Sequence, residues 1–191
     1  MKVSALPTAA GVVAALQRPG ATDDGRGGPD PEPIEIMGPV LALHASNAEQ
    51  WDREDDARRP GADDAAVAAA KRDIDRLNRA RHGFIEAIDQ AISGALDPDG
   101  GAPLVTESPG MAIDRLSVLV IRLAATEARA AAGTADARRY AERLPRLRRQ
   151  LDALVEATAL LFDELASGAR RFYAHESLKL YGPGDPGRDG P

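Results

Sequence analysis

The stretch KRDIDRLNRARHGFIEAID, residues 71–89, decides the fold class, because its apolar residues recur at the spacing of an α-helix. An advance of about 100° per residue places these apolar side chains on one helical face: Val67, Ile74, Leu77, Phe84, Ile85, Ile88 and Ile92. Arg81 falls in the middle of that face. Burying a guanidinium is unfavourable unless acidic partners pair with it. We therefore expect Arg81 to be partly buried against carboxylates, with Glu54 and Asp55 as the first candidates.

Helix start and stop signals extend this pattern to four helical segments: residues 38–59, 63–93, 108–132 and 136–167. The third has a strong start signal, because Ser108 can cap the helix and Pro109 fits its first turn. Pro145 lies inside the fourth segment. It predicts a kink or break near Arg143, since proline removes a donor from the helical hydrogen-bond ladder.

The distribution of apolar residues along these segments predicts how they pack. The third segment is apolar on nearly all sides, so we expect it to be the central helix. Short links favour antiparallel neighbours. The sequence therefore predicts an all-α fold, an antiparallel four-helix bundle with a short C-terminal helix or arm. Composition divides the chain into a disordered lead, a helical-bundle domain and a disordered tail, at residues 1–34, 35–181 and 182–191.

Composition also excludes several classes of protein. The net charge is −6, which argues against nucleic acid as the main partner. The absence of cysteine excludes disulfides, thiolate metal sites and cysteine nucleophiles. No window of the sequence is long and apolar enough for a membrane span. Pro7 and Gly11 break the apolar run near the N-terminus, which argues against a secretory signal, so we expect a cytoplasmic protein.

Sequence motifs for metal and cofactor binding are absent. A di-iron or di-manganese bundle needs Glu-x-x-His pairs, and none occurs. The three histidines, His44, His82 and His175, lie far apart in the sequence. There is no Walker A loop, no G-x-G-x-x-G and no G-x-S-x-G nucleophile elbow. We therefore expect neither a metal ion nor an organic cofactor.

Polar side chains occupy helical positions where an ordinary core would be apolar. In the first segment they lie within an arc of about 100°: His44, Asn47, Trp51, Glu54, Asp55 and Arg58. In the second segment, Lys71, Asn78 and Asp89 border the stripe that contains Arg81. In the third, Glu127 lies on an apolar face. These groups can pair as a structural network between helices, or they can surround a polar ligand.

Three stretches also carry a resemblance to a known family: QWDREDDARRP at residues 50–60, the stretch at residues 71–89, and ESPGMAIDRLSVL at residues 107–119. Together with Lys179 and Tyr181 they resemble domain-of-unknown-function family 4254, a bacterial helical family. The resemblance spans about residues 43–181. Members of that family accompany genes of cell-surface polysaccharide or other biosynthetic pathways, so the resemblance implies a pathway role.

Two functions from different classes fit these observations. The first is a non-catalytic binding or accessory protein of the implied pathway, which holds an anionic or sugar-like ligand in an inward charged groove. The second is a metal-independent transferase or lyase acting on a phosphorylated or carboxylated substrate. There Glu54 or Asp55 would act as acid or base, and four cations would hold the anion: Arg58, Lys71, Arg81 and Arg115. We prefer the first, because no nucleophile or cofactor motif is visible, and whether the protein is an enzyme stays open.

The candidate ligand-binding residues are the inward polar side chains, with Asp114 added from the family-like stretch: His44, Trp51, Glu54, Asp55, Arg58, Lys71, Asn78, Arg81, Asp114 and Arg115. Arg115 and Arg122 point to one side of the third segment. The candidate partners are an anionic or sugar-like small molecule, a pathway enzyme and a second copy of the chain. We expect neither nucleic acid as a partner nor a membrane span.

Overall fold

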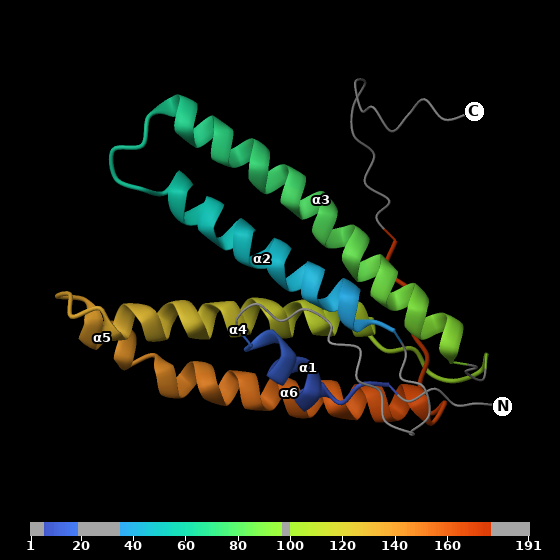
Figure 1. Ribbon diagram of the computed structural model, residues 1–191. Coiled ribbons are helices and arrows are strands. Elements are labelled where there is room, and N and C mark those ends of the chain that lie inside the picture. The colour runs from blue at the N-terminus through green and yellow to red at the C-terminus, as the bar shows by residue number, and fades with distance from the viewer. Residues whose placement is uncertain (1–5, 19–34, 97–99, 177–191) are drawn as a thin grey trace, which may run out of the picture.

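The computed structural model describes residues 6–18, 35–96 and 100–176, and within these ranges the chain is built from helices (Figure 1). In chain order they are α1 (Ala9–Leu16), α2 (Met37–Ala57), α3 (Asp64–Ala95), α4 (Pro109–Ala131), α5 (Ala137–Ala141) and α6 (Leu144–Ala166). The β pairing among these residues is limited to one isolated bridge between Leu104 and Arg171. None of the described helices has the length and apolar character needed to cross a membrane. The all-α prediction is confirmed.

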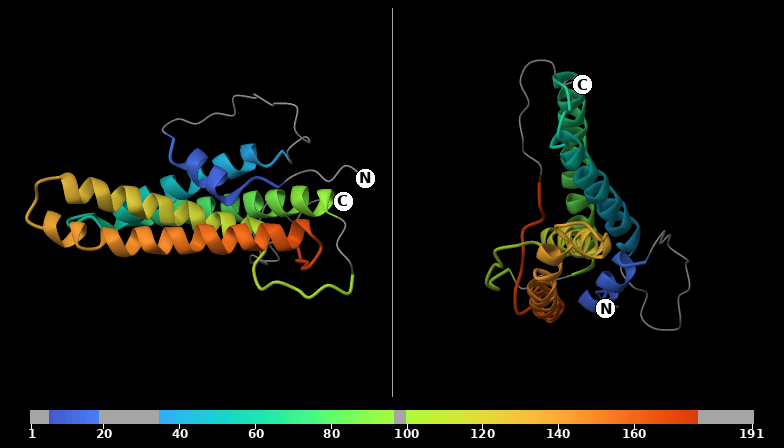
Figure 2. Two further views of the ribbon diagram at one scale, coloured as in Figure 1. Left: turned by 90° about the horizontal axis from the view of Figure 1, so that it is seen from below. Right: turned by 90° about the vertical axis from the view of Figure 1, so that its left-hand side faces the viewer.

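The long helices form two antiparallel hairpins, α2 with α3 and α4 with α6. In Figure 1 the α2–α3 hairpin runs obliquely to the α4–α6 hairpin, and Figure 2 shows the same two pairs from two further directions. Helix α4 contacts each of the other described helices. Its buried residues include Ile113, Leu116 and Val120. The predicted antiparallel four-helix bundle with a central third helix is confirmed.

Local sequence signals set the helix ends as predicted. Ser108 caps α4, because its Oγ accepts a hydrogen bond from the backbone N–H of Met111 at 3.3 Å. Pro109 lies in the first turn of α4, where its missing N–H costs nothing. Pro145 lies in the first turn of α6, and the fourth predicted segment is broken near Arg143 into α5 and α6.

Helix α1 lies where the sequence predicted a disordered lead, so that prediction is wrong for this part of residues 1–34. Val12, Val13 and Leu16 are buried in the main hydrophobic core. A helix this short is marginal in water, and here the bundle stabilises it by covering its apolar side chains. Residues 1–5 and 19–34 of the predicted lead, and the predicted tail, lie outside the described residues.

The described C-terminal segment, residues 169–176, is an extended strap and not a helix. It runs beside the loop that precedes α4. The backbone N–H of Val105 donates to the carbonyl of Arg171 at 3.0 Å, and the N–H of Arg171 donates to the carbonyl of Pro103 at 3.1 Å. Of the two forms predicted for this segment, the extended arm is the one present.

Candidate functional site

A network of polar side chains, which we call the Asp114 network, joins three helices inside the bundle. Its members are Arg81 on α3, Asp114 and Ser117 on α4, and His44 and Asn47 on α2. Asn47, Asp114 and Ser117 are 6%, 4% and 0% exposed. Polar groups at this depth are stable only when their hydrogen bonds are satisfied. Each contact in the network therefore contributes to the fold.

Arg81 and Asp114 form the charged part of the network. Arg81 Nε lies 2.7 Å from Asp114 Oδ1, and Arg81 Nη2 makes a second close contact with Asp114 Oδ2. The Arg81 side chain is 31% exposed and that of Asp114 is 6% exposed. The hydrogen bond to Asp114 raises the pKa of Arg81, while burial acts in the opposite direction. The predicted partial burial is confirmed, but the predicted partners, Glu54 and Asp55, are wrong.

The hydrogen bonds of the network have a defined direction. Asn47 Nδ2 donates to Asp114 Oδ1 and to Ser117 Oγ, both at 3.0 Å, which uses both of its N–H groups. Ser117 Oγ lies 3.0 Å from His44 Nδ1. Since Ser117 Oγ already accepts from Asn47, we assign its O–H as the donor to His44 Nδ1. His44 is then a neutral imidazole with its proton on Nε2, and burial favours this form because it lowers the pKa of His44.

A groove with a volume of about 650 Å³ opens between α4 and α6, and Arg81 and Asp114 belong to its lining. Arg115 and Arg122 line this α4–α6 groove too, about two turns apart on α4. Arg115 Nη1 contacts both carboxylate oxygens of Glu107, at 2.8 and 2.7 Å. The larger apolar side chains of the lining come from both helices: Val118, Leu119, Leu154 and Leu161. The α4–α6 groove therefore combines guanidinium groups with apolar surface.

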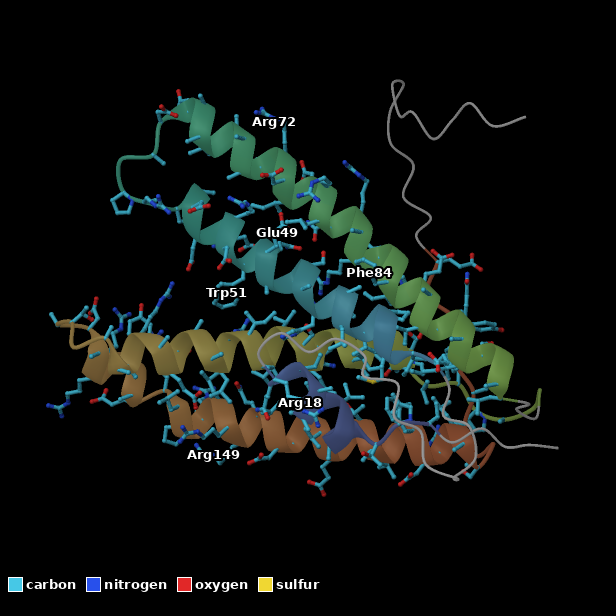
Figure 3. All side chains as sticks on the ribbon, in the orientation of Figure 1. Arg18, Glu49, Trp51, Arg72, Phe84 and Arg149 are labelled. Carbon is cyan, nitrogen blue, oxygen red and sulfur yellow. The ribbon has the colours of Figure 1, made fainter. Side chains whose placement is uncertain are left out.

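A second groove, the α1–α2–α4 groove, has a volume of about 700 Å³. His44, Trp51 and Asp52 line it from α2, and Figure 3 shows Trp51 pointing from α2 toward α4. Asp55 also lines it and pairs with Arg129 of α4 at 2.6 Å. The Asp114 network thus reaches one groove through Arg81 and Asp114 and the other through His44.

Four predicted site residues lie outside both the network and the two grooves: Glu54, Arg58, Lys71 and Asn78. Glu54 pairs with Arg58 at 2.8 Å, and Lys71 pairs with Asp75 at 2.9 Å. The side chains of Arg58 and Lys71 are 70% and 67% exposed. In Figures 1 and 2 this end of the α2–α3 hairpin stands clear of α4 and α6. A helical wheel gives the direction of a side chain around its helix, but not how far the covering helices extend along it.

The other inward candidates have separate surroundings. Asn78 is half-buried on α3. Glu127 pairs with Arg148 of α6 at 2.8 Å and its side chain is 45% exposed, so it does not join an interior cluster. The inward polar residues identified in the sequence therefore do not form one interior cluster. The charges separate into the Asp114 network and a set of peripheral ion pairs.

Sequence reasoning missed Ser117 and included Asp114 only through the family-like stretch. A signal was present, because Asp114 and Ser117 are three residues apart and share one face of a helix, among the apolar residues Ala112, Ile113, Leu116 and Val118. Asp89, outside the Asp114 network, is a further buried carboxylate. It is 0% exposed, and its carboxylate accepts from the backbone N–H groups of Gly110 at 2.7 Å and of His175 at 2.8 Å.

The two histidines outside the network meet in space. His82 Nδ1 lies 3.0 Å from His175 Nε2, and the planes of the two rings differ by 20°. Over residues 6–18, 35–96 and 100–176, no group of three or more histidine, aspartate or glutamate side chains has an arrangement that could hold a metal ion.

Comparison with known proteins identifies a family. No match was found among curated proteins or among solved structures. The matching family model carries the description "Protein of unknown function (DUF4254)" and covers residues 38–174, a range that includes the whole Asp114 network. On this match, which extends over most of the chain, the protein belongs to the DUF4254 family.

Proposed function

We propose that the protein is a non-catalytic binding protein that holds an anionic small molecule in the α4–α6 groove. The main observation in support is that Arg81 pairs with Asp114 through one edge of its guanidinium and also belongs to the lining of the groove. In this proposal the protein is an accessory component of a cell-surface polysaccharide or other biosynthetic pathway, a role that rests on the family resemblance alone.

Some of the N–H donors of the Arg81 guanidinium are available to bind a ligand. A guanidinium has five N–H donors, and Asp114 engages only those of Nε and one from Nη2. The Nη1 end has no hydrogen-bond partner among the described residues. A guanidinium already oriented by a buried carboxylate loses little freedom when it binds a phosphate or carboxylate. Asp114 therefore supports anion binding by positioning Arg81.

The charges and shape of the groove favour an anion with an apolar body. The acidic side chains in the lining, Asp114 and Glu107, are both already paired with arginine. Arg122 pairs with no described residue, so the lining has a net positive charge. The apolar side chains of α4 and α6 can cover a hydrocarbon chain or ring. An amphiphilic phosphate or carboxylate fits this combination best.

The test is isothermal titration calorimetry with hexyl phosphate and with inorganic phosphate. We expect hexyl phosphate to bind more tightly, because each buried methylene contributes about 0.8 kcal/mol. Arg81→Lys keeps the charge but loses the planar fork, and Arg122→Gln removes the unpaired cation. Each should weaken the binding of hexyl phosphate by about tenfold.

Arg138→Gln is the matched control. Arg138 lies on α5, pairs with Glu142, and has a side chain that is 91% exposed. This variant should bind hexyl phosphate as the parent does. The proposal would be rejected if the parent bound no hexyl phosphate, or if Arg81→Lys bound it equally well.

The transferase or lyase alternative needs an acid or base beside the anion. The residues predicted for this role, Glu54 and Asp55, pair with Arg58 and Arg129 and do not line the α4–α6 groove. We therefore do not extend the proposal to catalysis.

A further inference from the structure

The α1–α2–α4 groove is separate from the α4–α6 groove, since no residue lines both. The polar groups in its lining that have no partner among the described residues include the Nε2–H of His44, the indole N–H of Trp51 and the carboxylate of Asp52. The first two are donors and the third is an acceptor. A complementary occupant therefore carries both hydrogen-bond acceptors and donors.

His44 supplies a fixed donor to this groove. Its Nδ1 accepts from Ser117, which is 0% exposed, so the ring cannot turn over without breaking a buried hydrogen bond. The proton is then on Nε2, and the imidazole lines the groove. A ring nitrogen or carbonyl oxygen of a ligand can accept from it.

The spacing along α2 defines the size of the occupant. His44 and Asp52 are separated by about 12 Å along the helix axis. Long side chains on a helix lean toward its N-terminal end, so Trp51, which also lines the groove, is placed to cover the surface between them. Leu16 of α1 and Leu123 of α4 add apolar walls. A molecule that reaches from His44 to Asp52 needs a flat part for Trp51 and a second unit with hydroxyl groups.

The charge of the groove selects against an anion. Asp55 and Glu127 line it, but each is paired with an arginine, at 2.6 and 2.8 Å. Asp52 has no such partner among the described residues, so its negative charge in the lining is not neutralised by an arginine. A phosphate placed beside Asp52 would be repelled.

We propose that the α1–α2–α4 groove binds an uncharged nucleoside. The base stacks on Trp51 and accepts a hydrogen bond from His44 Nε2–H, and the sugar hydroxyls donate to Asp52. This site differs in position and in ligand charge from the anion site proposed above, so either can be rejected without the other.

Trp51 is the one tryptophan in the chain, so its fluorescence reports on this groove directly. The experiment titrates the full chain with adenosine and, separately, with adenosine monophosphate. We expect saturable quenching by adenosine and binding of the monophosphate that is about tenfold weaker, because of the charge on Asp52. His44→Phe keeps an aromatic ring without the donor and should weaken adenosine binding by about tenfold.

Two further variants serve as controls. Asp52→Asn should reduce the difference in affinity between adenosine and the monophosphate. Asp152→Asn, at an exposed position on α6, should leave that difference unchanged. Arg122→Gln, in the other groove, should bind adenosine as the parent does.

The proposal is overturned if adenosine causes no saturable quenching in the parent, or if the monophosphate binds as tightly as adenosine. It is also overturned if folded His44→Phe binds adenosine as tightly as the parent; should that variant fail to fold, the comparisons with the monophosphate and Asp52→Asn still decide it.

Discussion

Arg81 has two neighbours of different kinds, the buried carboxylate of Asp114 and the open α4–α6 groove. Its place on the apolar face of α3 could be predicted, because the helical period fixes the direction of a side chain around its own helix. Its partner could not, since the period does not say which residue of another helix packs opposite. The sequence points to Glu54 and Asp55 on α2, whereas the partner in the structure, Asp114, lies on α4.

Arg81→Leu should lower the free energy of unfolding by about 3–5 kcal/mol, because it leaves the buried Asp114 carboxylate without its cation. Chemical denaturation measures this change. The double variant Arg81→Leu/Asp114→Leu should be more stable than Arg81→Leu, since it removes the stranded charge. A double variant that is less stable than the single one would show that the charge of Asp114 is not what Arg81 compensates.

The titration of His44 should make stability depend on pH. Burial lowers the pKa of His44 from its ordinary value of 6.5, so the unfolded chain binds this proton more readily than the folded chain. The contribution of neutral His44 to stability is therefore full above pH 6.5 and is lost as the pH falls from there toward the lowered pKa. Calorimetric melting at pH 7.5 and pH 5.5 should give a larger fall in Tm for the parent than for His44→Gln. Equal falls would contradict the assignment.

At the scale of the elements, the start of α4 lies very close to α3, and Gly110 makes that approach possible. A Cβ at Gly110 would lie 2.6 Å from the carbonyl oxygen of Ile85 and 2.9 Å from Asp89 Oδ1. The start of α4 could be predicted, because Ser108 and Pro109 are local signals. The close packing could not, since it depends on the backbone of another helix.

Gly110→Ala should destabilise the protein by about 1–3 kcal/mol, because the added methyl group pushes α4 away from α3. Gly83→Ala is the matched control, since nothing lies within 4 Å of its added Cβ. That change should stabilise the protein by about 0.5–1 kcal/mol, as alanine favours a helix interior. Urea denaturation of both variants measures the two effects, and a tolerated Gly110→Ala would mean that the helices can separate at little cost.

At the scale of the whole molecule, the core is complete only with α1 in place. Val12 and Leu16 are 0% and 4% exposed and belong to the same core as residues of α2, α3, α4 and α6. The sequence AAGVVAAL is too short to show a helical stripe, and its helix depends on tertiary packing. The four long helices could be predicted because each has a repeating apolar face. Helix α1, the fifth helix that contributes to the core, has no such repeating pattern.

Leu16→Ala should lower the free energy of unfolding by about 2–5 kcal/mol, as expected when a buried leucine is truncated. Leu160→Ala makes the same substitution at a position on α6 that is 60% exposed, and it should change stability by about 0.5 kcal/mol or less. Differential scanning calorimetry of the two variants compares them directly. Similar melting temperatures would mean that α1 contributes little to the core.

The two hydrogen bonds of Asp89 also affect the order in which the chain can fold during its synthesis on the ribosome. Its carboxylate caps the start of α4 through Gly110 and holds the strap through the backbone of His175. The chain is made from its N-terminus, so the bond to Gly110 can form before residue 175 has been added. Until then one oxygen of a carboxylate that ends 0% exposed lacks its last protein donor, which disfavours full dehydration of that region. We therefore expect Asp89 to delay closure of this end of the bundle until residue 175 has been synthesised.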